Sequence, residues 1–312
     1  MRVATWNDPH SSFPADAERL GVDSLWSPEA WGFDAFTPLA YAAAQTSTVR
    51  LGTAIAQIGA RTPAMLAMTA LSMQALSRGR FILGLGTSGP QVMEGWHGVT
   101  FDRPIQRTRE TIETVRAICA GEKVGKIRSP IAQHVPIYVA SLGPANLRLT
   151  GELADGWIGN SFVPEHAEVF FAPMREAGRF DELDITVAVG LEITDDETVG
   201  RRHARGYAFT FGAMGSPTQN FYVDAFARQG FEDDVRAVQR LWLDGRREEA
   251  ADRVPEEIGF KTNLLGPPQM IKERLRAYRD CGVTTLRVGL PAERDLDSLA
   301  QLIDLVHEVD SE

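Results

Sequence analysis

The chain has 312 residues, 44% of them hydrophobic, so it can bury a large core as one barrel-sized domain or as two smaller ones. Its formal net charge of −10 argues against a nucleic-acid or anionic-membrane surface, because both partners select a basic face. No apolar stretch is long enough to span a membrane, and the N-terminus lacks the regions of a signal peptide, so we expect a soluble cytoplasmic protein.

Short apolar runs alternate with amphipathic segments through the first half of the chain, as expected for strands followed by helices. Proline at the start and glycine after the end mark several of these helices. We predict strands at 1–6, 22–27, 49–56 and 81–85, and helices at 12–21, 37–45, 63–76 and 105–118.

The strand at 81–85 runs directly into Gly86, Thr87, Ser88 and Gly89. A buried strand that ends in glycine and hydroxyl side chains permits close approach of a ligand to the backbone. We therefore predict that this strand end forms the floor of a ligand site, and that residues 89–104 after it form a functional loop.

The second half of the chain continues the alternation. We predict strands at 135–140, 157–160, 185–193 and 284–288, and helices at 143–154, 165–177, 268–281 and 296–309. The segment of about residues 195–265 is too long for a simple crossover, and we expect it to form an insertion of helices and loops. Eight strand–helix units without a linker predict an α/β protein, a single (β/α)8 TIM-barrel domain over residues 1–312 with a helical insertion after the seventh strand.

In such a barrel the active site lies at the C-terminal ends of the strands. Most residues at these ends are small or neutral and polar, without the nucleophile and base of a hydrolase or the clustered ligands of a metal site. This lining favours a flat cofactor that carries the chemistry itself. The predicted ends are Glu29, 54–57, Thr87 to Gly89, Ala140, Ser141, Asn160 and Gly289.

Four stretches carry a resemblance to a known family. They are PEAWGFDAFTPLA from Pro28, RLGTAIAQIGARTPAMLA from Arg50, GRFILGLGTSGPQVMEGWHG from Gly79, and VPIYVASLGPANLRLTGELADGW from Val135. Together they resemble the luciferase-like oxidoreductases that use the deazaflavin coenzyme F420, close to the methylenetetrahydromethanopterin reductase-like members of actinobacteria. The similarity continues through the insertion and the C-terminal region, so it covers nearly the whole chain.

The resemblance implies a TIM-barrel enzyme, usually a homodimer, that moves hydride between C5 of F420 and a small organic substrate. It also implies a non-prolyl cis peptide bond between Ala54 and Ile55, which bulges under the deazaflavin ring. The implied cofactor contacts are Ala54, Ile55, Gln57, Arg61, Thr87, Ser88, Ala140, Ser141, Leu142 and Gly143.

Within this set the resemblance implies separate roles. Thr87 and Ser88 match contacts to the ring and the ribityl chain. Residues 141–143 match the turn before a helix whose N-terminus receives the cofactor phosphate, a favourable place for an anion. Arg61 either contacts the cofactor tail or forms an ion pair at the surface.

Glu29 and His97 are the candidate catalytic residues. Glu29 matches the acidic position near the ring edge and is a candidate proton source, as is water. His97 either donates a proton to the substrate or fixes the loop that contains it. Trp31, Trp96 and His97 are expected to line the substrate pocket, with core packing as the alternative for Trp31.

Two positions depart from the sugar dehydrogenases of this family. Ala30 stands where those enzymes carry histidine, and Gly89 stands where they carry glutamate. Because this acid–base pair is absent, we expect reduction of an imine, an activated alkene or a C1-carrier-like acceptor rather than sugar oxidation. Two alternatives stay open: an FMN-dependent monooxygenase of the luciferase type, and a non-catalytic flavin- or deazaflavin-binding protein.

Overall fold

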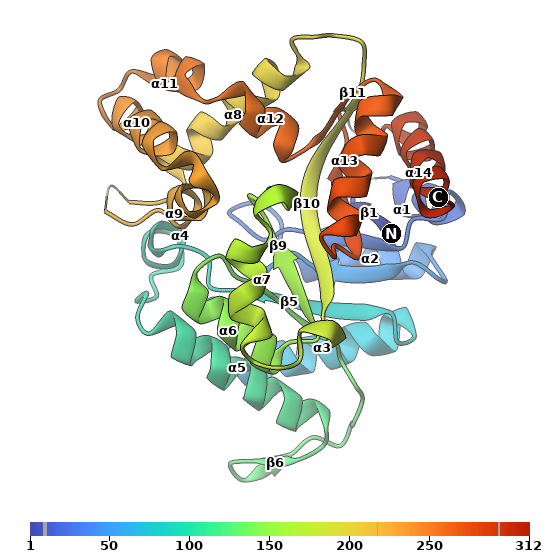
Figure 1. The fold of residues 1–312 in the computed structure, drawn as a ribbon. Coiled ribbons are helices and arrows are strands. Elements are labelled where there is room, and N and C mark those ends of the chain that lie inside the picture. The colour runs from blue at the N-terminus through green and yellow to red at the C-terminus, as the bar shows by residue number, and fades with distance from the viewer. Residues whose placement is uncertain (9–10, 217, 293) are drawn as a thin grey trace.

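The computed structural model describes residues 1–8, 11–216, 218–292 and 294–312. Parallel strands alternate with helices along these residues (Figure 1). The strands of the central barrel are β1 (Arg2–Trp6), β2 (Ser24–Ser27), β3 (Arg50–Thr53), β5 (Phe81–Gly86), β8 (Ile137–Ala140), β9 (Gly156–Gly159), β10 (Asp184–Ile193) and β12 (Thr285–Gly289). Each strand pairs with the next, and β12 pairs with β1, so the ring closes and the predicted (β/α)8 barrel is confirmed.

Helices cover the outside of the barrel, and the strand residues that point outward pack against them. On β12, Leu286 and Val288 belong to this outer core, so the alternating residues Thr285 and Arg287 point to the barrel axis. The covering helices are α1 (Phe13–Arg19), α2 (Phe36–Gln45), α3 (Pro63–Ser77), α5 (Pro104–Cys119), α6 (Pro144–Leu153), α7 (Glu168–Arg175), α13 (Pro268–Asp280) and α14 (Leu296–Asp310).

The third strand differs from the prediction. A single strand over 49–56 was wrong: β3 ends at Thr53, and a short strand β4 (Ala56–Gln57) resumes the pairing with β5. The bond between Ala54 and Ile55 is cis, as the resemblance implied. Across the gap, the Thr53 hydroxyl accepts a hydrogen bond from Gly84 N at 2.9 Å and donates one to Gly84 O at 2.7 Å. One side chain thus satisfies the backbone groups that the interrupted ladder leaves without partners.

Four further elements, one helix and three short strands, were not predicted. The expected loop at 89–104 contains a short helix, α4 (Pro90–Gly95), whose first residue is proline. A hairpin of β6 (Lys123–Val124) and β7 (Ile127–Arg128) follows α5. Strand β11 (Leu264–Gly266) extends the far end of β10 beyond the barrel ring.

The insertion after β10 forms a group of helices at one side of the barrel (Figure 1, yellow to orange). They pack around their own core, in which Phe211, Phe226 and Phe231 are buried. Phe211 therefore packs the insertion. The helices are α8 (Val199–Ala213), α9 (Phe221–Phe226), α10 (Glu232–Leu243), α11 (Arg247–Arg253) and α12 (Glu256–Lys261), with a π-helical turn at Ala227–Phe231. Within the described ranges, none of the helices has the length and apolar character needed to cross a membrane.

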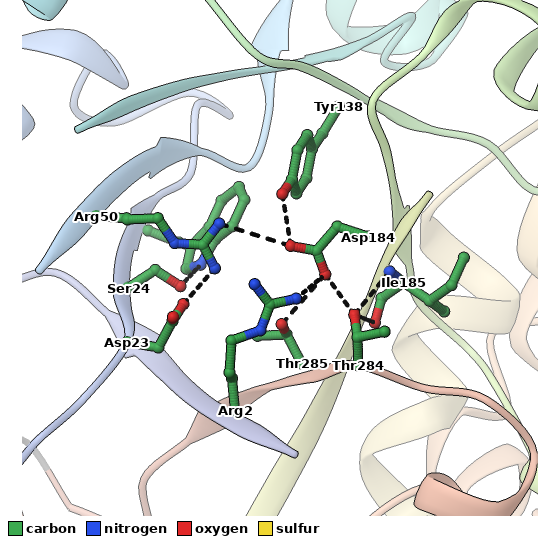
Figure 2. A network of polar contacts seen from close by, with 10 residues as sticks. Arg2, Asp23, Ser24, Arg50, Tyr138, Asp184, Ile185, Thr284 and Thr285 are labelled. Atoms are coloured by element: carbon green, nitrogen blue, oxygen red, sulfur yellow. Dashed lines mark hydrogen bonds and ion pairs between the residues drawn. The ribbon is translucent and has the colours of Figure 1, made fainter. Parts of the chain in front are cut away.

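A polar network closes the N-terminal end of the barrel (Figure 2). Asp184 lies at its centre: its carboxylate is 2.5 Å from an Arg2 nitrogen, accepts a hydrogen bond from Tyr138 Oη at 2.5 Å, and lies 3.6 Å from Arg50. Arg50 also pairs with Asp23 at 2.5 Å. Every charge in this layer has an opposite partner, which is the arrangement that makes buried charges tolerable.

Candidate active site

The apolar floor of the barrel mouth combines residues from the junction between β3 and β4 with a residue of β8. Ala54, Ile55 and Ala140 are only partly buried, and they lie on the inner cluster that contains Trp26 and Ile158. The approach of Ile55 depends on a glycine opposite it, because a Cβ on Gly86 would lie 2.7 Å from Ile55 Cγ1. The structure therefore brings together three of the ten predicted cofactor contacts, as a surface against which a flat ring could lie.

The end of β5 adds two hydroxyl groups beside this floor. Ser88 has φ of 57°, a left-handed conformation that is uncommon outside glycine and often found at functional sites. Its hydroxyl makes no hydrogen bond to any residue in the described part of the chain, which leaves it free for a ligand. Thr87 Oγ1 instead donates to Ser88 O at 3.1 Å.

Glu29 lies in an ion pair rather than at an open ring edge. Its Oε2 accepts hydrogen bonds from Arg61 Nη1 at 2.6 Å and from Gln57 N at 2.9 Å, and its Oε1 accepts one from Ala35 N at 3.3 Å. The side-chain amide of Gln57 in turn donates a hydrogen bond to Glu29 O at 2.9 Å. Glu29 therefore fastens the loop after β2 to β4 through charge-assisted hydrogen bonds.

Arg61 forms an ion pair with Glu29, and both side chains of the pair are largely buried. Its side chain is 21% exposed, that of Glu29 is 8% exposed, and its guanidinium lies 4.9 Å from the centre of the Phe36 ring. It also affects Asp34: burial would raise the pKa of that carboxyl, but hydrogen bonds from Thr37 and Phe36 and the charge of Arg61 lower it. The predicted residues Glu29, Gln57 and Arg61 thus form one cluster that supports the β3–β4 bulge.

The turn before α6 has the properties of an anion site. Gly143 caps this helix without a side-chain hydrogen bond, so N–H groups of its first turn are available. Arg228 of the insertion donates to Leu142 O at 2.6 Å, beside that N-terminus, and partial burial lowers its pKa while Asp224 opposes the shift. The Ser141 hydroxyl instead bonds Thr150 Oγ1 at 2.8 Å, so Ser141 could contact a ligand there only through its backbone.

The position of Arg228 is set by its neighbour Gln229. The Gln229 side chain accepts from Val163 N at 2.8 Å and donates to Ser161 O at 2.8 Å, which fixes the π-helical turn of the insertion to the loop after β9. π-helical turns of this kind are frequent at functional sites. Arg228 was not among the predicted site residues, because its contact joins residues 86 positions apart and no local sequence pattern marks it.

The three predicted pocket residues lie on the rim. Trp31 is 56% exposed and Trp96 is 66% exposed, so neither packs in the core in this structure. His97 is partly buried beside α4, and its Nε2 is buried without a hydrogen-bond partner in the described residues. The segments that hold these residues follow the C-terminal ends of β2 and β5, so their place in the substrate pocket stays a prediction.

A cavity of about 370 Å³ lies elsewhere, between α5 and the start of β8. Arg116, Cys119 and His134 are among the residues that line it. Burial raises the pKa of Cys119 to about 11, so its thiol is protonated at neutral pH and is a poor nucleophile. This cavity opens at the opposite end of β8 from the mouth and does not belong to the candidate site.

The model of the luciferase-like monooxygenase family matches residues 13–285. The chain is 34% identical to a putative coenzyme F420-dependent oxidoreductase of Mycobacterium tuberculosis, over 94% of each chain. It is 28% identical to the 5,10-methylenetetrahydromethanopterin reductase of Methanolobus tindarius, over 92% of this chain and 91% of the relative. The structure of the F420-dependent tetrahydromethanopterin reductase of Methanopyrus kandleri superposes with a TM-score of 0.79 at 21% identity, covering 99% of this chain and 98% of that one.

Proposed function

This chain belongs to the luciferase-like monooxygenase family, and we propose that within it the protein is a coenzyme F420-dependent oxidoreductase that transfers hydride between the cofactor and an organic substrate. The similarity over 94% of each chain to a putative F420-dependent oxidoreductase supports the choice of cofactor. The observation that carries the proposal is Arg228 at the N-terminus of α6, an anion site at the edge of an apolar floor. F420 has two matching parts: a flat deazaflavin ring and a tail that carries a phosphate.

The residues present fit such a group. Ala54, Ile55 and Ala140 would support the ring, the free Ser88 hydroxyl would bond its ring or ribityl chain, and the turn before α6 with Arg228 would hold the phosphate. When bound, F420 supplies the carbon of its ring that accepts or donates hydride. The protein's own task is then to bind, orient and cover both reactants.

Glu29 is a positioning residue in this proposal. Its carboxylate holds the β2 loop against Gln57 and Arg61, so replacing it would move the bulge under the ring. A proton for the product would come from water or from His97, whose Nε2 makes no hydrogen bond to the described residues.

The reaction we propose is reduction of an already polarised acceptor, such as an imine, an activated alkene or a C1-carrier-like compound. Ala30 and Gly89 supply no acid or base at the two positions that alcohol oxidation would use. Hydride donation to a polarised acceptor needs less proton transfer from the protein, which agrees with this lining. Trp31, Trp96 and His97 would border the substrate at the rim.

The phosphate contact can be tested with Arg228→Met. We expect this variant to bind F420 about 10- to 100-fold more weakly, because a hydrogen bond to a charged group is worth about 1.5 to 3 kcal/mol. Titration followed by F420 fluorescence measures the change.

The same titration with the phosphate-free deazaflavin should give equal affinities for variant and wild type. Arg236→Met, which removes an ion pair with Glu232 on exposed α10, is the control and should not change F420 binding. Equal losses for both ligands would contradict a phosphate role for Arg228.

We also propose that the protein is a homodimer that uses α3. This helix has no charged residue, and its outward face carries Met65, Met68 and Leu76, each more than half exposed. Tyr41 of α2 is 55% exposed as well. Uncharged apolar helix faces of this kind are uncommon on monomers and typical of subunit contacts.

Sedimentation velocity should therefore give twice the mass of one chain. Met68→Glu should shift the protein to monomers, since it places a charge in the contact where Met68 is 61% exposed. Met270→Glu on α13, where Met270 is 40% exposed, should leave the dimer intact. A wild-type monomer at micromolar concentration would contradict the proposal.

A further inference from the structure

Arg287 is a cation inside the barrel that lies outside the proposed cofactor contacts. It lies on the inward face of β12, is 3% exposed, and its Nε and Nη1 atoms are buried without a hydrogen-bond partner among the described residues. Burial lowers the pKa of Arg287 to about 10, so the side chain remains charged at neutral pH. A buried cation with unused donors is costly to keep unless something compensates it.

Among the described residues, the surroundings of Arg287 offer aromatic rings but no anion. Its guanidinium lies 4.8 Å from the centre of the Trp6 ring and 5.7 Å from that of Trp26. Its strand neighbours are Ala4 on β1 and Ala188 on β10, both too small to reach it with a polar group. None of the described carboxylates lies within 4 Å of it. The rings compensate only part of the cost of burial.

Two other arginines point into the barrel, and each of them has a carboxylate partner. Arg2 and Arg50, in the layer at the N-terminal end, both approach Asp184, and Arg50 has Asp23 as well (Figure 2). Arg287 stands nearer the mouth of the barrel and has no such partner. A second polar group on the same side, the Thr186 hydroxyl of β10, is also buried without a partner in the described chain.

The place of Arg287 in the ring separates it from the proposed cofactor contacts. Those contacts come from β3, β5 and β8, whereas β12 lies four strands from β5 in the closed ring of eight, on the opposite side. Gly289, two residues further along β12, has no side chain to cover Arg287: a Cβ there would lie in ordinary contact with Val189 O at 3.7 Å and Trp6 Nε1 at 3.9 Å. A molecule beside the cofactor could reach the guanidinium from there.

We propose that Arg287 receives a carboxylate or comparable oxyanion of the organic substrate, so that the substrates of this enzyme are small organic acids. The proposal rests on the proposed function, because that function assigns the opposite half of the mouth to the cofactor. Arginine suits this role since its planar fork binds a carboxylate through two hydrogen bonds. The carboxylate would satisfy the free donors and neutralise the charge, and its fixed position would set which end of the substrate faces the hydride.

The test uses benzoate as the anionic probe, benzamide as its neutral counterpart, and the full-length protein without cofactor. Because Trp6 and Trp26 contact Arg287, tryptophan fluorescence should report binding. Wild type should bind benzoate and not benzamide, and Arg287→Met should bind benzoate at least about tenfold more weakly. Arg287→Lys, which keeps the charge without the fork, should fall between them. A wild type that binds no benzoate, or an unchanged affinity in Arg287→Met, would overturn the proposal.

Two further readouts separate the proposal from its rivals. F420 affinity should be unchanged in Arg287→Met; a tenfold loss there would assign the arginine to the cofactor and overturn the substrate role. The ligand-free variant should resist urea at least as well as wild type, because it loses an uncompensated charge, whereas Arg50→Met should be clearly less stable. A destabilised Arg287→Met with normal benzoate binding would show a structural residue. If neither protein bound F420, the proposed function would fail while the benzoate comparison still tested Arg287.

Discussion

Replacing Asp184 by asparagine is expected to lower the free energy of unfolding by about 3 to 5 kcal/mol, the range seen when one partner of a buried charge pair is removed. The carboxylate is 12% exposed and approaches both Arg2 and Arg50, and it accepts a hydrogen bond from Tyr138. Asparagine keeps the size of the side chain but leaves two partly buried guanidinium groups in one layer with only Asp23 to balance them. Urea unfolding at pH 7 measures the loss.

The pH dependence of this contribution has a definite sign. Burial would raise the pKa of Asp184, but hydrogen bonds from Thr284 and Tyr138 and the charges of Arg2 and Arg50 lower it below its ordinary value. A lowered folded-state pKa contributes stability that is present above the unfolded pKa of about 3.9 and is lost as the pH falls through the folded value. The difference between wild type and Asp184→Asn should therefore shrink in acid.

A surface ion pair provides the control for Asp184. Glu152 pairs with Arg109 at 2.5 Å, but both side chains are well exposed. Glu152→Gln should change the free energy of unfolding by less than about 1 kcal/mol, because solvent screens exposed pairs. If Asp184→Asn cost no more than Glu152→Gln, the network in Figure 2 would not be what stabilises the base of the barrel.

Gly84→Ala is expected to cost about 3 kcal/mol or more, at the upper end of overpacking effects. An added Cβ would lie 1.8 Å from Thr53 O and 2.7 Å from Ile158 Cδ1. Thr53 cannot move away easily, because its hydroxyl bonds both backbone groups of Gly84. The variant should unfold at lower urea and bind F420 poorly.

Gly95→Ala is the matched control for Gly84→Ala. A Cβ on Gly95 would meet nothing within 4 Å, so its stability should stay within about 0.5 kcal/mol of wild type. Comparable stability of the two variants would mean that the strand end is more adaptable than its contacts indicate.

The barrel could be predicted because its signals are local. Apolar strands, helix punctuation and the excess length after the seventh strand each lie within one segment of the chain, and their order gives the architecture. The break between β3 and β4 is different. Nothing in the composition of 49–57 distinguishes a continuous strand from an interrupted one, and only the resemblance located the cis bond at Ala54–Ile55.

For the candidate site, the sequence indicates positions at the strand ends but not the interactions that the side chains make. Glu29 was predicted as a site residue because it follows the end of a strand. Its ion pair with Arg61, however, joins residues 32 positions apart and depends on how two loops meet. In the sequence, Arg287 is one residue of a predicted strand. The alternation of side chains along a strand is enough to predict that it points toward the barrel axis. That none of the described residues pairs with Arg287 follows only from the assembled barrel, in which β1 and β10 flank β12, because a neighbouring strand could have brought an acid, as β10 brings Asp184 to Arg2 and Arg50.

The choice of cofactor is the central claim, and parallel titration of the wild-type protein with F420 and with FMN tests it most directly. Quenching of F420 fluorescence with micromolar or tighter affinity, together with much weaker binding of FMN, is the predicted result. Tight binding of FMN without a response to F420 would contradict the claim and favour a flavin-dependent monooxygenase on the same barrel.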